Sequence, residues 1–328
     1  MKFGLLLPHF GAHANKRMLL DGSVLAESYG FDSLWVRDHL VFEPHGEMEN
    51  PDPNFYEALT TLTAIGAVTE KISLGTGSLI PFRHPIHTAL TVGTMCQLLG
   101  DRLIMGWGAG TFDHEFEVIG WEGVNRVEMV RSNSEILRRL FTEDNVSYKD
   151  EFFSFENVTI QPRPNKPVPF WYCGATPKSA RLAAEYADGW MPGRTTLRTI
   201  HDRRETMKGL VKENGRPLPT VAVIPPTSIA SRSELAWDGL NVDGLIAWAN
   251  KRGKWWSKPE SGEFKTAADI EGSLIAGNPE KVIEQTLKFA EVGVDHLVFD
   301  LRLRFETWFA SIELLGNEVL PELRRRLG

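Results

Sequence analysis

Short apolar runs alternate with longer amphipathic segments along most of the chain, which predicts an α/β fold with parallel strands. Eight runs have the length and apolar character of buried strands: residues 3–7, 33–36, 72–76, 103–107, 168–172, 189–191, 221–224 and 296–299. Apolar residues recur at helical spacing over residues 18–29, 56–69, 86–99, 127–141, 179–186 and 279–292. An open doubly wound sheet usually has fewer strands and a glycine-rich fingerprint at its first turn, which residues 8–11 lack. The pattern therefore predicts a (β/α)8 TIM barrel with insertions.

Two segments interrupt this alternation. Residues near 145–162 alternate aromatic with polar side chains and predict a β-hairpin appended to the barrel. A longer insertion near residues 225–272 carries four tryptophans between Trp237 and Trp256. These tryptophans either line an apolar substrate pocket, as part of a lid over the barrel mouth, or only attach the insertion to the barrel. No low-complexity linker divides the chain, so we expect residues 1–328 to form a single domain.

Composition narrows the class of protein. The 42% of hydrophobic residues and 24% of charged residues are ordinary for a globular protein with a full core. A formal charge of −7 argues against nucleic-acid binding, which requires clustered basic residues. The first apolar run is too short for a signal peptide and ends at Pro8, and no run approaches the roughly 20 residues of a membrane span. With only Cys96 and Cys173, far apart, we expect no disulfide framework and a cytoplasmic location.

Candidate chemistry is expected where strands end, because barrel enzymes carry their active sites in the loops that follow the strands. The second strand ends in Asp38 and His39. A histidine beside a carboxylate exchanges protons near neutral pH. Alternatively, His39 only bonds loop backbone and Asp38 only caps a turn. The residues alone leave both interpretations open.

Two further strand ends are candidate ligand sites. The fifth strand runs into Cys173, Gly174, Ala175 and Thr176, where Thr176 is a good N-cap before Pro177. The free amides at the start of such a helix bind phosphate. A bound phosphate would also stabilise the positive charge of Lys178 in the first turn, where it otherwise opposes the helix dipole. The alternative is an ordinary capped helix with a solvated lysine.

The third strand ends in Gly75, Thr76, Gly77 and Ser78. Two glycines around Thr76 indicate a bulge that supports one face of a flat ring, unless they only relieve crowding.

Metal and hydrolytic chemistry find little support. His84 and His87 stand three apart near a helix start, but no other metal-binding spacing is present, so packing and capping roles are expected and no metal site is predicted. Strand ends supply no pair of carboxylates for glycoside hydrolysis. A non-redox barrel, such as a hydrolase or a sugar-binding protein, would need either a metal site or a pair of carboxylates at the mouth.

Several segments together resemble the luciferase-like family of flavin-dependent monooxygenases and deazaflavin-dependent oxidoreductases. The resemblance covers nearly the whole chain in the right order, at residues 26–40, 72–77, 83–85, 101–103, 108–110, 167–174, 187–190, 277–280 and 293–296. It implies a luciferase-like (β/α)8 barrel, often dimeric, with an isoalloxazine-type ring at the barrel mouth.

By this resemblance, a bulge at Gly77 and Ser78, next to Thr76, backs the ring and contains a non-proline cis peptide bond. Gly174 to Thr176, with Cys173 and Lys178 beside them, hold the cofactor phosphate. His39 faces the substrate side of the ring, with Asp38 beside it. Two departures stand out: Cys173 or Ala175 replaces a second glycine, and Leu99-Gly100-Asp101-Arg102 replaces the family's Ser-Gly-Gly-Arg turn.

The resemblance allows two cofactors. With FMN, the enzyme is a monooxygenase that uses oxygen and a separate flavin reductase, since the chain has no nicotinamide fingerprint. With the deazaflavin coenzyme F420, it is an oxidoreductase that transfers hydride to or from a small organic substrate. The Asp38-His39 pair resembles deazaflavin members more, and Lys178, Arg194 and Arg198 suit that coenzyme's acidic tail, so F420 is preferred. A family member without cofactor, acting as a structural or binding barrel, is the third possibility.

Overall fold

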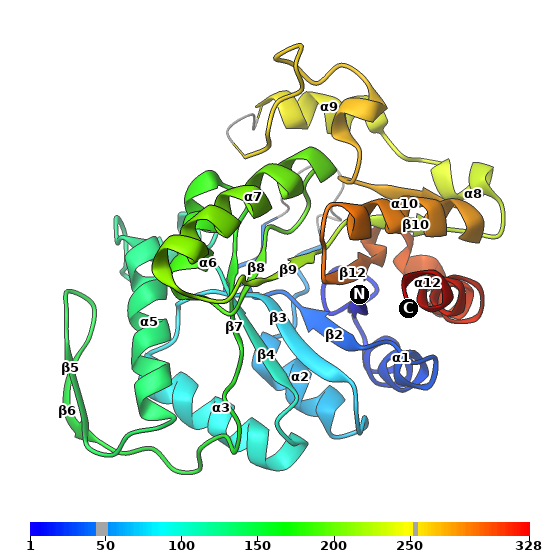
Figure 1. The fold of residues 1–328 in the computed structure, drawn as a ribbon. Helices are drawn as coiled ribbons and strands as arrows, with labels where there is room; N and C mark the ends of the chain where they lie inside the picture. The colour runs from blue at the N-terminus through cyan, green and yellow to red at the C-terminus, as the bar shows by residue number, and fades with distance from the viewer. Residues whose placement is uncertain (44–51, 252–254) are drawn as a thin grey trace.

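The computed structural model describes residues 1–43, 52–251 and 255–328. Eight parallel strands close into a barrel in the order β1-β12-β9-β8-β7-β4-β3-β2 (Figure 1). The strands are β1 (Lys2–Leu6), β2 (Ser33–Val36), β3 (Ser73–Leu79), β4 (Leu103–Trp107), β7 (Phe170–Cys173), β8 (Gly189–Met191), β9 (Thr220–Val223) and β12 (His296–Asp300). All eight coincide with predicted apolar runs, so the predicted TIM barrel is confirmed.

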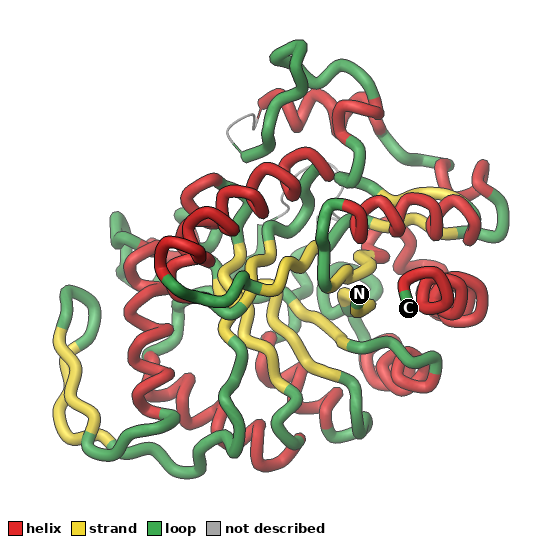
Figure 2. The backbone as a smooth tube through the Cα atoms, viewed as in Figure 1, coloured by secondary structure: helices red, strands yellow, loops and turns green. Residues whose placement is uncertain are grey.

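Helices surround the barrel and cover its outer face (Figure 2). They are α1 (Lys16–Ser28), α2 (Ala58–Gly66), α3 (Pro85–Leu99), α5 (Arg126–Leu140), α6 (Pro177–Tyr186), α7 (Leu197–Asn214), α10 (Pro279–Glu291), α11 (Trp308–Leu314) and α12 (Leu320–Leu327). Helix α7 was not predicted, because most of its residues are polar and few of them are buried. Among the described helices, none is both long and apolar enough to cross a membrane.

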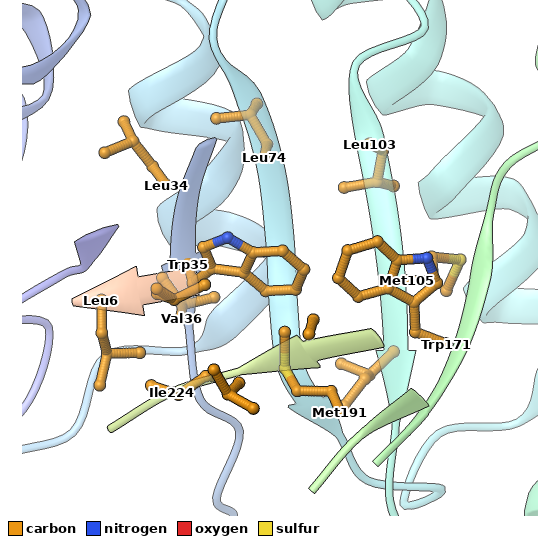
Figure 3. Packing of buried hydrophobic residues seen from close by; sticks show 14 of the residues in the cluster. Leu6, Leu34, Trp35, Val36, Leu74, Leu103, Met105, Trp171, Met191 and Ile224 are labelled. Carbon is orange, nitrogen blue, oxygen red and sulfur yellow. The ribbon is translucent and has the colours of Figure 1, made fainter. Parts of the chain in front are cut away.

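The barrel interior is filled by side chains from opposite strands (Figure 3). The rings of Trp35 and Trp171 stack with their centroids 5.2 Å apart. Glycines make this possible, since a Cβ on Gly75 would lie 2.4 Å from the Trp35 ring and one on Gly189 would lie 2.5 Å from Trp171. Any larger residue at either position would force these indoles to move. The interior is therefore a packed core, and ligands must bind above it at the mouth.

The predicted hairpin and the long insertion are both present. Strands β5 (Val146–Lys149) and β6 (Ser154–Val158) pair antiparallel. The insertion contains β10 (Thr227–Ile229), α8 (Ser233–Trp237), α9 (Val242–Lys251), the 3-10 helix η1 (Ala267–Ile270) and β11 (Ile275–Gly277). It forms a small core of its own from Leu245, Ala249, Trp256, Phe264 and Ile270.

The insertion docks on the loop after β8, where the indole of Trp256 donates to the carbonyl of Arg194 at 3.2 Å. Trp256 is 3% exposed. It thus attaches the insertion to the barrel. Trp237, in contrast, is 42% exposed at the end of α8.

Two buried histidines, one in β12 and one in the loop after β1, stay neutral. His296 bonds the Ser33 hydroxyl through Nε2 at 2.7 Å, with its ring edge-on to both Trp35 and Trp171. His9 bonds the Leu7 carbonyl through Nδ1 at 2.9 Å and is fully buried. Burial, which disfavours the charged ring, is the largest cause that lowers the pKa of each histidine from 6.5 to about 3.

We therefore expect the free energy of unfolding to fall as the pH is lowered from about 6.5 to about 3. Below pH 6.5 an unfolded histidine takes up a proton that the folded one refuses, so the stability present above 6.5 is progressively lost. Each histidine contributes up to about 1.4 kcal/mol per pH unit in this window. Urea unfolding at several pH values should give a shallower pH dependence for His296→Gln than for the wild type. If the wild type and His296→Gln lost stability with pH at the same rate, His296 would not be a source of the pH dependence.

Candidate active site

Asp38 and His39 both follow β2, but their side chains have different partners. The carboxylate of Asp38 accepts hydrogen bonds from Arg83 Nη1 at 2.7 Å and Nη2 at 2.9 Å, and from the amide of Ile80 at 3.0 Å. Burial lowers the pKa of Arg83, but the hydrogen bond and charge of Asp38 raise it by more, and Arg83 also bonds Glu57. Asp38 thus fastens the loop after β2 to the loop after β3.

His39 is paired instead with Glu115, which sequence analysis did not identify. Its Nδ1 lies 3.1 Å from Oε1 and 3.2 Å from Oε2 of Glu115, in the short helix α4 (His114–Glu117) after β4. Glu115 is 1% exposed and also accepts the amide of Leu40 at 2.7 Å. Glu115 stands 76 residues beyond His39, and no motif or spacing links the two.

This pairing defines the tautomer of His39. A buried carboxylate only accepts hydrogen bonds, so we assign the proton of a neutral ring to Nδ1, where it is donated to Glu115. Nε2 is then an acceptor, and Arg37 Nη2 lies 3.2 Å from it. The arrangement is a carboxylate–histidine dyad whose Nε2 is able to take a proton.

Aromatic rings surround His39. The centroid of its ring lies 5.5 Å from that of Phe42, 5.1 Å from Phe55 and 5.5 Å from Phe112. Phe10 extends the group, at 6.2 Å from Phe42 and 5.8 Å from Phe55. We call Phe10, Phe42, Phe55 and Phe112 the mouth aromatics. They pack around the His39 side chain, which is only 6% exposed and also contacts Glu115 and Arg37.

The expected bulge at the end of β3 is confirmed. The register of β3 against β4 shifts between Thr76 and Leu79, and the Gly77–Ser78 peptide bond is cis. The Thr76 hydroxyl donates to the Gly106 carbonyl at 2.9 Å and accepts the Gly106 amide at 3.0 Å, so it joins β3 to β4.

The bulge faces across the barrel. A Cβ on Gly77 would lie 3.0 Å from Ile224 and 3.2 Å from Met191, both of which stand on the opposite side of the core (Figure 3). The absence of a side chain at Gly77 therefore lets this backbone pack closely against Ile224 and Met191.

The loop after β7 has the geometry of an anion site. Thr176 caps α6, its Oγ1 accepting the Ser179 amide at 3.1 Å, and a Cβ on Gly174 would lie 2.5 Å from the Ser179 hydroxyl. In the described part of the chain, the amides of Ala175, Thr176 and Lys178 donate to no protein group. The exposed Lys178 ammonium likewise has no ion-pair partner among the described residues. Such a cluster of donors at a helix start suits a phosphate.

The loop after β8 lies against this one. The amide of Gly174 donates to the Met191 carbonyl at 3.0 Å, and the Trp190 indole donates to the Gly174 carbonyl at 2.9 Å. In this second loop the Thr195 hydroxyl is buried and has no hydrogen-bond partner among the described residues. The Thr195 hydroxyl is thus an unpaired polar group among the described residues, in the loop after β8, and nothing in the sequence indicated it.

Other candidate residues have structural partners. Burial raises the pKa of the Cys173 thiol, so it stays uncharged beside the phosphate loop. Arg194 lies with its guanidinium 4.1 Å from the centre of the Trp248 ring, while Arg198 is exposed. His84 Nδ1 accepts the amide of Ile86 at 3.3 Å and caps α3, which is the capping role expected for it.

Comparison with known proteins identifies a family and relatives with similar sequences. The sequence model of the luciferase-like monooxygenase family matches residues 1–296. A protein of Intrasporangium calvum named F420-dependent glucose-6-phosphate dehydrogenase is 34% identical, with 94% of this chain and 95% of the relative covered. A protein of Archaeoglobus fulgidus named 5,10-methylenetetrahydromethanopterin reductase is 26% identical, with 92% of this chain and 94% of the relative covered.

Two solved structures share the fold. An F420-dependent secondary alcohol dehydrogenase in complex with an F420-acetone adduct superposes with a TM-score of 0.80 at 22% identity, over 98% of this chain and 99% of the other. The oxygenating constituent of 3,6-diketocamphane monooxygenase from Pseudomonas putida, in complex with FMN, has a TM-score of 0.78 at 19% identity, with the same coverage of 98% and 99%.

Proposed function

The chain belongs to the luciferase-like monooxygenase family, and from that premise we propose that it is an F420-dependent oxidoreductase that transfers hydride to or from a small organic substrate. The observation that carries the proposal is the dyad of His39 and Glu115 at a mouth that also holds a phosphate-type donor cluster. Relatives that match along 92–94% of this chain are named for F420 or for a reductase of a methylenetetrahydropterin.

The cofactor would be held at both ends. Its ring would rest against the bulge at Gly77 and Ser78, with Thr76 keeping β3 and β4 in register. Its phosphate would bind the free amides of Ala175, Thr176 and Lys178, with Gly174 allowing close approach and Cys173 contributing an uncharged neighbour. The ammonium of Lys178 adds charge complementarity to the same group.

His39 would handle the proton that accompanies the hydride. When bound, a deazaflavin ring accepts or donates hydride and does not activate oxygen as FMN does. His39 Nε2 would take the proton of a substrate hydroxyl, or return it to a carbonyl oxygen. Glu115 keeps the ring oriented and stabilises the imidazolium that forms. Asp38 acts one step further away, since its bonds to Arg83 and Ile80 hold the loop that delivers His39.

The alternative functions have less support. FMN-dependent monooxygenase activity with a separate reductase is represented by neighbours under 25% identical, which share the fold alone. A barrel without cofactor would leave no use for the free amides at the start of α6.

We expect the protein to bind F420 at micromolar concentrations and FMN at least about tenfold more weakly. Gly174→Ala should weaken F420 binding by about tenfold or more, because the added Cβ would lie 2.5 Å from the Ser179 hydroxyl in the phosphate loop. Gly209→Ala is the matched control, since no atom lies within 4 Å of a Cβ there. Fluorescence titration of the three proteins measures this. Failure of the wild type to bind F420 would end the proposal.

His39→Asn should lower kcat about 100-fold or more with F420 affinity unchanged, because it removes proton transfer without touching the phosphate loop. Glu115→Gln should lower kcat less, since the amide oxygen still accepts the Nδ1 proton but no longer stabilises an imidazolium. His201→Asn, at an exposed position of α7, is the control. Normal steady-state turnover by His39→Asn would remove the proton role.

We also propose a cytoplasmic homodimer, consistent with the two free cysteines. Exposed apolar side chains are available on the outer helices, with Leu90 (42%) and Leu98 (70%) both on α3. Sedimentation equilibrium should give about twice the 36.9 kDa of one chain, and Leu98→Lys should shift the mass toward that of the monomer. A wild-type protein that sediments as a monomer would exclude the dimer.

A further inference from the structure

A cavity lies between the insertion and the outer helices α7 and α10. Its volume is about 290 Å³, and the residues that line it come from α7, α8, α9, η1, the segment after η1 and α10. These residues are distinct from the mouth aromatics and from the loop before α6. Hydrophobic side chains make up much of the wall: Leu197, Trp237, Val242, Ile270, Leu274 and Phe289.

The volume of the cavity sets the size of its ligand. An apolar cavity of about 150 Å³ in another protein holds one benzene ring. A cavity of about 290 Å³ therefore has room for roughly two fused aromatic rings. It stands at the lower end of the range of ligand pockets, which begins at about 300 Å³. The size thus favours a small molecule.

One aromatic side chain of the wall remains exposed. Trp237 lines the cavity and is 42% exposed at the end of α8, whereas Phe289 of α10, which lines the same cavity, is buried. A flat apolar ligand that covered the Trp237 indole would remove apolar surface from water and would also gain from stacking. The wall therefore favours an aromatic ligand over a highly polar one such as a sugar.

A buried hydroxyl belongs to the same wall. Ser273 lines the cavity and is 0% exposed, and its Oγ has no hydrogen-bond partner among the described residues. Buried polar groups are normally paired, because an unpaired one loses its bonds to water without replacement. The amide of Gln285, in contrast, is committed to the backbone of Ala276, at 2.8 Å and 3.2 Å. One hydrogen-bonding group on the ligand would satisfy Ser273.

The two charged side chains of the wall compensate each other. Glu271, just after η1, and Lys288, on α10, form an ion pair, and both side chains are half-exposed. A charged ligand would have to compete with one of these partners for the other. An uncharged ligand leaves the pair intact.

We propose that this cavity is a second ligand site, which binds an uncharged molecule of about two fused aromatic rings with one hydroxyl or similar group. The rings lie against Trp237 and the apolar wall, and the polar group bonds Ser273 Oγ. The site is independent of the proposed function, since it uses no residue of the mouth. It joins the insertion to the barrel at the start of α7, where the Leu197 amide donates to the Glu271 carbonyl at 2.8 Å.

The test uses two probes that differ by one hydroxyl group, 2-naphthol and naphthalene. Equilibrium dialysis against the full chain, read by the fluorescence of the naphthalene ring, gives both dissociation constants. We expect about 10–100 µM for 2-naphthol and about tenfold weaker binding of naphthalene. Ser273→Ala should abolish the difference between the probes, because the hydroxyl of 2-naphthol then loses its partner.

Variants of the wall locate the binding. Ala268→Phe, which adds a ring to the wall at η1, should weaken both probes about tenfold or more. Ala247→Phe is the matched control, at an exposed position of α9 that does not line the cavity. Phe112→Leu, at the mouth, should leave both affinities unchanged. Thermal unfolding of each variant checks that it is folded.

Each outcome bears on the proposal. Absence of 2-naphthol binding to the wild type at concentrations up to about 1 mM would overturn the site. Equal affinities of the wild type and Ala268→Phe, or a loss of binding in Phe112→Leu alone, would overturn it as well. Naphthalene that bound the wild type as tightly as 2-naphthol would overturn the role of Ser273. None of these measurements involves F420, so the proposed function is tested separately.

Discussion

The buried carboxylate of Glu115 is the constraint on which the mouth of this barrel depends. It accepts hydrogen bonds from His39 Nδ1 and from the amides of Leu40 and Val41, and it is 1% exposed. A buried charge is tolerated only when its oxygens are satisfied, so these bonds fix the loop after β2 against the loop after β4. The same bonds set the tautomer of His39. One interaction therefore decides both loop geometry and the chemistry available at Nε2.

The rest of the mouth has two sides that differ in the groups they offer a ligand. Backbone dominates one side: the bulge at Gly77 and Ser78, and the free amides around Thr176. Those groups suit a flat ring and its anionic tail. Aromatic side chains dominate the other side, around His39. The rigid barrel below keeps the two sides in register, since its interior is filled by stacked indoles.

Most of the fold could be predicted from the sequence, because buried parallel strands are short continuous apolar runs that stand out between polar loops. Helix α7 was not predicted, because its sequence pattern is mainly polar and the helix is stabilised by tertiary contacts and the Thr196 cap. The bulge and the capped phosphate loop were also readable, because glycine and cap residues have local geometric meanings.

The site was predicted only in part, because its key contacts join distant segments. Asp38 was expected beside His39 at the site, but its carboxylate bonds Arg83 and Ile80, and the carboxylate on His39 is that of Glu115. Glu115 and Thr195 left no sequence signal at all, since burial alone gives them meaning. Thr76 was expected near the cofactor, whereas its hydroxyl is committed to Gly106.

A crystal structure of the protein with F420 and a carbonyl substrate tests the central claim most directly. The account predicts the phosphate on the amides of Ala175, Thr176 and Lys178, and the carbonyl oxygen about 2.6–3.2 Å from His39 Nε2. It also predicts that Glu115 still holds Nδ1. A cofactor ring bound away from the bulge at Gly77 and Ser78 would contradict the account. A substrate oxygen held by any group other than His39 would also contradict it.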